Sequence, residues 1–205
     1  MPIPTYPDSA PISLDMQPEL HPALSVIEDG ISEFTFANLY LFRKSYDYRL
    51  SRIGDLLVVS GARDGKRFFM MPCGLPDDNG IIESLLADHD YIKGLAERHA
   101  DANRVRLERM GWQPVEDRDN FDYLYLRSDL AALQGRKYHK KRNLVNAFIN
   151  NYTYDESPLT PQNISEAFQV LNQWREERTE KDDDYEAARE ALELVDRLGL
   201  HGYIV

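Results

Sequence analysis

The sequence predicts an α/β fold of the α+β kind, in which a mixed, largely antiparallel sheet is flanked by helices. A run of short apolar strands separated by turn signals lies between residues 46 and 71. Apolar residues at helical spacing occur both before and after that run. Hydrophobic residues make up 42% of the 205 residues and charged residues 29%, a composition that can bury a core.

The N-terminal part predicts an extended arm followed by a helix. Residues 1–30 are rich in proline and show little periodicity, so we expect an extended arm there. Ser32 is a typical N-cap, and Glu33 suits a first helical turn. Phe36 and Leu39 then share one apolar face, so a helix is expected from Ser32 onward.

An antiparallel meander is predicted next. Its strands cover residues 46–53, 55–60 and 67–71, with turns at Gly54-Asp55 and across residues 61–66. Residues 79–99 then predict one long helix, which Gly94 can bend or break. Alternation predicts further strands at residues 104–108 and 121–126, the latter reading FDYLYL.

The C-terminal part predicts helices joined by short strands. Helices are expected at residues 129–133, 136–149, 160–177 and 185–198, and brief strands at 152–154 and 200–205. Thr160 and Pro161 suit the cap and the first position of the third of these helices, whose inward face is expected to carry Ile164, Phe168, Leu171 and Trp174. Because an unpaired strand edge is a liability, we expect a continuation of the chain or a partner strand to complete the last sheet.

Charge and targeting signals favour the cytoplasm. The formal net charge is −11, so a nucleic acid or an anionic membrane needs a local basic patch to bind. The N-terminus lacks the basic and apolar regions of a signal peptide, and no stretch approaches the ~18 apolar residues of a transmembrane helix. The single cysteine, Cys73, excludes an internal disulfide and is expected to be a small core residue.

Known cofactor and metal motifs are absent from the sequence. There is no glycine-rich dinucleotide or nucleotide loop, no serine-hydrolase elbow and no zinc-protease motif. His89 between Asp88 and Asp90 has poor ligand geometry, because adjacent helical residues point apart. No cofactor is evident, and no metal site is predicted.

The most informative feature is a basic segment. Its five cations within seven residues are Arg136, Lys137, Lys140, Lys141 and Arg142. Residues 129–152 carry +4, so the remainder of the −11 chain carries −15. Cations near a helix N-terminus are costly unless an anion lies close, because that end is already partly positive. We therefore expect the segment to contact phosphates of RNA, a lipid head group or an acyl donor.

An alternative is that these cations pair with acids of the chain itself, such as Asp117, Asp119 and Asp122. A buried stripe of Tyr138, Val145, Phe148 and Ile149 is expected on the same helix. Tyr123 and Tyr125 share a strand face and either line a pocket or pack in a core or interface.

Three motifs resemble a known family. They are Ser32-Glu33 with Phe36, Asn38 and Leu39; residues 119–125; and Leu130, Leu133 and Gly135 with Lys137 and residues 139–143. Together they resemble the phosphatidylglycerol lysyltransferase C-terminal domain family, and the third motif is the most specific. The similarity extends from about residue 31 to the end.

The resemblance implies tandem acyltransferase units of the N-acetyltransferase (GNAT) type. A first unit is then expected at residues 31–158, after the arm at 1–30, and the start of a second at 159–205. The implied activity moves an aminoacyl group from charged tRNA to a lipid hydroxyl or another acceptor. A pocket is expected to include Asn38, Tyr123, Tyr125, His139 and Asn143.

Three functions follow as hypotheses. The first is an acyltransferase whose donor is an aminoacyl-tRNA. Such chemistry needs donor and acceptor held together and an oxyanion stabilised, and no nucleophile of its own. Catalytic residues stay unassigned, although Tyr123 or His139 can move a proton. The second is a non-catalytic module that binds RNA or anionic lipid, and the third is an N-acetyltransferase with an acyl-CoA donor.

Overall fold

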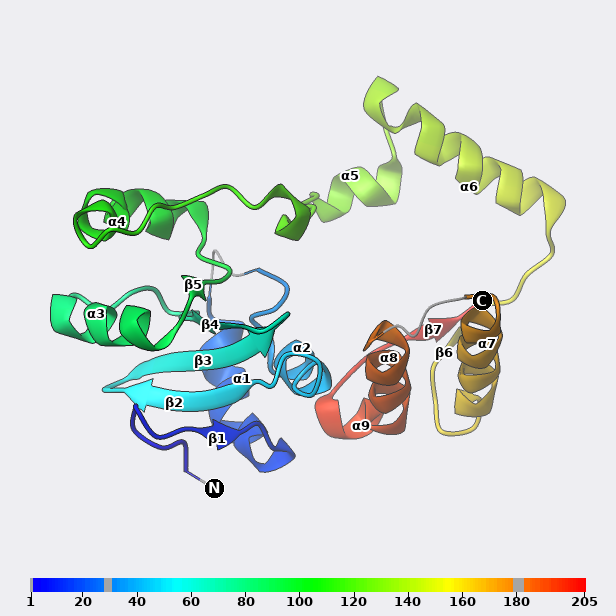
Figure 1. Ribbon diagram of the computed structural model, residues 1–205. Coiled ribbons are helices and arrows are strands. Elements are labelled where there is room, and N and C mark those ends of the chain that lie inside the picture. The colour runs from blue at the N-terminus through cyan, green and yellow to red at the C-terminus, as the bar shows by residue number, and fades with distance from the viewer. Residues whose placement is uncertain (1, 28–30, 179–182) are drawn as a thin grey trace. The chain divides into compact units, whose positions relative to one another are not determined.

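The chain forms two compact units in the computed structural model, which describes residues 2–27, 31–178 and 183–205. Unit 1 comprises Met1–Phe121 with Lys181–Glu190, and unit 2 comprises Asp122–Glu180 with Ala191–Val205. The class is α+β, as predicted: a five-stranded mixed sheet and a small two-stranded sheet accompany the helices (Figure 1).

Unit 1 is built on a five-stranded sheet with the order β1-β2-β3-β4-β5. The strands are β1 (Ala10–Pro11), β2 (Arg49–Ile53), β3 (Leu56–Arg63), β4 (Lys66–Met70) and β5 (Tyr91–Ile92). Neighbours from β1 to β4 are antiparallel, whereas β5 runs parallel to β4, with Phe68 opposite Tyr91. The predicted meander is confirmed.

The β3–β4 hairpin shows how local sequence sets the register. Arg63 pairs with Lys66, which leaves Asp64 and Gly65 as a two-residue loop. Both loop residues have positive φ, 51° and 76°, as the tight hairpin turn requires. Strand β3 therefore continues to Arg63, three residues beyond the predicted end.

The core of unit 1 covers both faces of the sheet. Consecutive residues are buried in β3 and β4, which is the pattern of strands packed on two sides. One cluster joins Val58 and Phe69 to residues of α3 (Asn79–Asp88) and α4 (Glu97–Arg109). Buried Leu20 and Leu24 lie on α1 (Gln17–Ser25), and buried Phe36, Leu39 and Tyr40 on α2 (Phe36–Leu41).

The extended arm was predicted only in part correctly. Residues 10–11 pair with β2, but Leu14–Met16 form a short 3-10 helix that leads into α1. Pro18 lies in the first turn of α1, where a missing N–H costs nothing, so proline here starts a helix. Residues 1 and 28–30 of the predicted arm lie outside the described residues.

Ser32 is not the cap of the next helix. Helix α2 begins at Phe36, and its N-cap is Thr35, whose hydroxyl accepts a hydrogen bond from the Asn38 N–H at 3.2 Å. Ser32 instead donates to the Glu33 carboxylate at 3.4 Å.

The long helix predicted at residues 79–99 is wrong. Helix α3 ends at Asp88, strand β5 follows, and α4 begins at Glu97. Gly94 lies between β5 and α4 with φ 66°, a backbone conformation that glycine adopts readily. The predicted strand at residues 104–108 lies inside α4, and Leu107 is its buried residue. Cys73 is exposed, so its expected place in the core was also wrong.

Unit 2 contains α5 (Arg127–Ala132), α6 (His139–Asn151), α7 (Ile164–Glu176) and α9 (Val195–Leu198). A 3-10 turn at Arg136–Tyr138 leads into α6, and β6 (Ser157–Pro158) pairs antiparallel with β7 (Tyr203–Ile204). Helix α8 (Asp183–Glu193) crosses the boundary between the units. The expected inward stripe of α7, formed by Ile164, Phe168, Leu171 and Trp174, is the less exposed face of that helix.

Several predicted elements of unit 2 differ. The FDYLYL segment forms no strand, and the brief strand expected at 152–154 is found at 157–158. Asn163 accepts hydrogen bonds from the Thr160 N–H and hydroxyl, so the chain turns there and α7 begins later, at Ile164. The single helix expected at 185–198 is divided after Glu193 into α8 and α9.

Candidate functional site

The basic segment lies at a sharp corner between α5 and α6. Helix α5 ends where Leu133 adopts a left-handed conformation, with φ 48°, and donates its N–H to the Asp129 carbonyl at 2.8 Å. Gly135 follows with φ 87°. These two positive-φ residues redirect the chain, so Arg136 opens a new turn and the cations gather at the N-terminal end of α6.

Two of the five cations hold this corner together. Lys137 Nζ donates to Asp129 Oδ2 at 2.8 Å, and the Tyr138 hydroxyl donates to the same oxygen at 3.3 Å. The Arg142 guanidinium donates to the carbonyls of Leu133 and Gly135, and the Gly135 carbonyl also accepts from the Tyr138 N–H at 3.4 Å. Lys137 and Arg142 are therefore structural.

The Asp129–Lys137 pair is electrostatically matched. The hydrogen bond from Lys137 lowers the pKa of the Asp129 carboxyl, and the hydrogen bond to Asp129 raises the pKa of the Lys137 ammonium. Both side chains therefore stay charged at neutral pH. The expected partners of the basic segment were acids such as Asp117, Asp119 and Asp122. Among the residues described, the carboxylate that pairs with it is that of Asp129.

The other three cations have no such role. Arg136, Lys140 and Lys141 are exposed, and none makes a hydrogen bond or ion pair with any residue in the described part of the chain. Lys140 and Lys141 occupy the first turn of α6, where the helix end adds partial positive charge. Three uncompensated cations thus face solvent from one corner.

The expected buried stripe of α6 is largely wrong. Tyr138 is buried, as predicted, but Val145, Phe148 and Ile149 are 45%, 42% and 52% exposed. Leu144 beside them is also exposed. Helix α6 therefore presents apolar side chains to solvent as well as cations.

The residues expected to form a pocket lie in both units. Tyr123 and Tyr125 are exposed, and their rings stack with centroids 6.4 Å apart and an interplanar angle of 15°. His139 and Asn143 are exposed on α6, four residues apart and hence on one face. Asn38 is half-buried on α2 in unit 1. The pocket itself stays a prediction.

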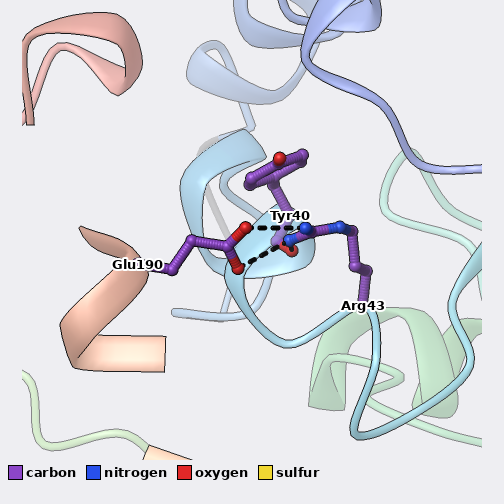
Figure 2. A network of polar contacts seen from close by, with 3 residues as sticks. All are labelled: Tyr40, Arg43 and Glu190. Atoms are coloured by element: carbon purple, nitrogen blue, oxygen red, sulfur yellow. Dashed lines mark hydrogen bonds and ion pairs between the residues drawn. The ribbon is translucent and has the colours of Figure 1, made fainter. Parts of the chain in front are cut away.

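A second polar cluster, which the sequence did not indicate, joins α2 and α8 within unit 1. The Arg43 guanidinium donates two parallel hydrogen bonds to the Glu190 carboxylate, at 2.9 and 2.7 Å (Figure 2). Arg43 also donates to the Tyr40 carbonyl at 2.5 Å and lies 3.7 Å from the centre of the Tyr40 ring. These hydrogen bonds lower the pKa of Glu190. The partners are 147 residues apart, so no local pattern reveals them.

A third cluster surrounds Lys93, just after β5. Its ammonium lies 3.8 Å from the Glu33 carboxylate and 4.4 Å from the centre of the Tyr46 ring. Burial lowers the pKa of Lys93, while Glu33 opposes that shift. Glu33 belongs to the first family motif, and this pair explains why an acid stands there. Lys93 is a half-buried cation paired with a carboxylate, unlike the three at the α6 corner.

No group of three or more His, Cys, Asp or Glu side chains within the described ranges is placed to hold a metal ion. No helix in the same ranges is both long enough and apolar enough to cross a membrane.

The fold and the charged corner define the class: an α+β protein with a mixed sheet and a solvent-facing basic helix start. The family model described as phosphatidylglycerol lysyltransferase, C-terminal, matches residues 24–205, and the chain belongs to this family. Membership relates it to lysyltransferase-like acyltransferases in general.

A solved structure supports the fold. The crystal structure of a conserved protein of unknown function from Bacteroides thetaiotaomicron is 28% identical, with a TM-score of 0.79. The similarity covers 96% of this chain and 70% of that one. No curated protein sequence matches the chain significantly.

Proposed function

We propose that the chain serves an acyltransferase that moves an aminoacyl group from charged tRNA to a lipid or other acceptor. In this proposal Arg136, Lys140 and Lys141 contact the phosphates of a substrate. The observation that carries it is that these three cations are exposed and unpaired on a chain of net charge −11.

The energetics favour a ligand at this corner. Three like charges beside a helix N-terminus repel one another and the helix dipole, so they destabilise the free protein. Phosphate oxygens would relieve that repulsion and accept charge-assisted hydrogen bonds. Because Asp129 and the carbonyls of Leu133 and Gly135 already bind Lys137 and Arg142, the corner is organised before any ligand arrives.

The order of elements supports a GNAT-like unit. Helix α2 precedes the antiparallel strands β2–β4, and α3 then leads to β5, which is parallel to β4, and to α4. This order is compatible with the GNAT-type unit proposed for residues 31–158. The tandem arrangement, with a second unit starting at residue 159, is part of the same proposal.

Two other functions remain candidates. A non-catalytic module would use the same three cations to bind RNA or anionic lipid and would show no turnover. An acyl-CoA-dependent N-acetyltransferase needs a phosphate-binding loop between a strand and a helix, and the described residues offer exposed cations at the α6 corner instead.

The test compares charge reversal at the corner with the same charge change elsewhere. In the variant Lys140→Glu/Lys141→Glu, tRNA affinity is expected to fall at least about tenfold, because each lost phosphate contact carries a large electrostatic contribution. The control is Lys66→Glu/Arg109→Glu, which alters exposed cations of unit 1 by the same total charge and should bind like the wild type.

Transfer of a radiolabelled aminoacyl group from charged tRNA to a lipid extract separates enzyme from binding module. The proposal expects transfer by the wild type and a loss in the corner variant. Equal tRNA binding by wild type and corner variant would overturn the phosphate role. Binding without transfer would favour the non-catalytic module.

A further inference from the structure

Unit 1 contains an open cavity of about 620 Å³ at the turn of the β3–β4 hairpin and the start of β5. The cavity is lined by Arg63, Asp64, Lys66, Asp90 and Tyr91. All five residues belong to unit 1, and the proposed function uses none of them. Cavities of roughly 300–1,000 Å³ hold small molecules in proteins, so this one has the size of a ligand site.

The strand register places two cations and one ring on the same face of the sheet. Arg63 lies directly opposite Lys66, and Phe68, two residues further along β4, lies opposite Tyr91. Paired residues and residues two apart share a sheet face, so the two cations and the Tyr91 ring point to one side. Like charges directly opposite each other repel, and a carboxylate placed between them would relieve that repulsion.

The aromatic wall of the cavity is closely packed. The ring centres of Tyr91 and Phe68 are 5.4 Å apart, and the Tyr46 ring meets Phe68 edge-on at 6.2 Å. Gly61 makes room for this packing, because a Cβ atom there would lie 2.6 Å from Phe68 Cζ and 2.9 Å from the Tyr46 carbonyl oxygen. The Lys93 ammonium lies 5.5 Å from the centre of the Phe68 ring. The wall is therefore in place before any ligand arrives.

Carboxylates lie around the Tyr91 ring as well. Burial raises the pKa of the Tyr91 hydroxyl, and the negative charges of Asp64, Asp117 and Asp90 raise it further. Asp90 is partly engaged, because its Oδ2 accepts a backbone N–H of β4 at 2.7 Å. Asp64 and Lys66 make no hydrogen bond or ion pair with any residue in the parts of the chain that the structure describes. Groups of both signs can therefore meet a ligand in one cavity.

We infer that this cavity binds a small zwitterion, a free amino acid, whose carboxylate meets Arg63 and Lys66 and whose ammonium group meets Asp64 and Asp90. The side chain of the amino acid packs on the Tyr91 ring. The two cations and two carboxylates that line the cavity sum to zero, which suits a ligand of no net charge. The inference goes beyond the proposed function, because it adds a second site that involves none of the α6 cations.

Ligands with only one kind of charge fit this cavity less well. A phosphate or a simple carboxylate would be repelled by the carboxylates around Tyr91, and a simple amine would be repelled by Arg63 and Lys66. An amino acid holds its opposite charges a few bonds apart, so both can be matched at once. Simple anions and simple amines are therefore outcomes of the test.

Ligand-detected NMR of the full chain with each standard free amino acid, at up to about 10 mM, tests for binding in the range expected of small ligands. Titration calorimetry then compares the amino acid that binds with the amine that lacks its carboxylate and the acid that lacks its amino group. Phenylalanine, phenethylamine and 3-phenylpropionate form one such set. Each analogue is expected to bind at least about tenfold more weakly, because it loses a charge-assisted contact.

Two variants test the two ends of the ligand. Arg63→Ala/Lys66→Ala removes the cations that meet the carboxylate, and Asp64→Asn removes a charge that meets the ammonium group. Asparagine, like aspartate, tolerates the left-handed conformation at residue 64, where φ is 51°. Each variant should bind the amino acid at least about tenfold more weakly than the wild type.

The matched controls remove the same charges from exposed positions elsewhere in unit 1 and should bind like the wild type; they are Lys44→Ala/Arg109→Ala and Asp55→Asn. Four results would overturn the inference. They are absence of binding by every amino acid, an analogue that binds as tightly as the amino acid, wild-type affinity in both cavity variants, and a lower melting temperature of Arg63→Ala/Lys66→Ala, which would show that these cations support the fold. Lys140→Glu/Lys141→Glu should bind the amino acid like the wild type, so a failure at one site leaves the other proposal standing.

Discussion

Arg43 and Glu190 show what one residue pair can do for a fold. Their two parallel hydrogen bonds connect the turn after α2 to α8, near the end of the chain. The side chains are only 14% and 20% exposed, so the ion pair is shielded from solvent far better than a surface pair. The Tyr40 ring beside Arg43 adds a cation–π contact.

Replacing Glu190 by Gln should therefore destabilise unit 1. We expect the free energy of unfolding to fall by about 1.5–2 kcal/mol at neutral pH, the lower part of the range for hydrogen bonds to charged groups, because part of Glu190 remains exposed. Urea denaturation of the wild type and of Glu190→Gln, followed by circular dichroism, measures this difference in the free energy of unfolding. Glu186→Gln, an exposed position on the same helix, is the control and should change little.

The same pair predicts a pH dependence of defined sign. Arg43 lowers the pKa of Glu190 in the folded state, so the folded protein binds that proton less readily than the unfolded chain. The stabilisation is complete above the unfolded pKa, about 4.3, and is lost as the pH falls through the lower folded value. Denaturation curves of wild type and Glu190→Gln should converge in acid, and a constant difference would contradict the assignment.

At the scale of elements, the cap of α2 offers a direct test. Thr35→Ala removes the acceptor of the Asn38 N–H and should lower the free energy of unfolding by about 1 kcal/mol. Ser32→Ala should cost less, because Ser32 does not cap the helix. Thermal unfolding of the two variants shows which residue caps the helix. A larger loss of stability in Ser32→Ala than in Thr35→Ala would contradict the observed start of α2.

At the start of α6, in contrast to the cap of α2, substitution should not destabilise the fold. Lys140→Glu/Lys141→Glu places acids in the first turn, where the helix dipole favours them, and removes repulsion among the cations. We expect the melting temperature to stay the same or rise while binding of the phosphate-bearing partner falls. A clear loss of stability would show that these lysines support the fold.

The sequence predicted correctly those elements that neighbouring residues along the chain determine. The β3–β4 hairpin follows from Asp64-Gly65, and the inward stripe of α7 follows from helical spacing. The FDYLYL segment alternates as a strand does, but a strand also needs a neighbour to pair with, and unit 2 pairs β6 with β7 instead. Periodicity likewise shows that Val145, Phe148 and Ile149 share a face, but it does not show what covers that face.

The candidate site was predictable in composition but not in detail. The charge run located the corner, and the family motifs pointed to the same residues. Only the structure separates Lys137 and Arg142, which bind Asp129 and two carbonyls, from Arg136, Lys140 and Lys141, which bind nothing among the residues described. That distinction depends on left-handed Leu133, a conformation that its side chain gives no reason to expect.

For the whole molecule, charge asymmetry is the central feature. Residues outside 129–152 carry −15 and repel polyanions, while one corner attracts them. Binding of a polyanion should therefore be confined to that corner and should weaken steeply with salt.

The most direct measurement is the salt dependence of tRNA binding by the wild type and by Lys140→Glu/Lys141→Glu. Each phosphate contact contributes roughly 0.7–0.9 to the slope of log affinity against log salt concentration. We predict that the slope of the variant is smaller by about 1.4–1.8 and that its affinity is lower at every salt concentration. Identical slopes and affinities for the two proteins would contradict the claim that the unpaired cations of α6 meet a phosphate-bearing partner.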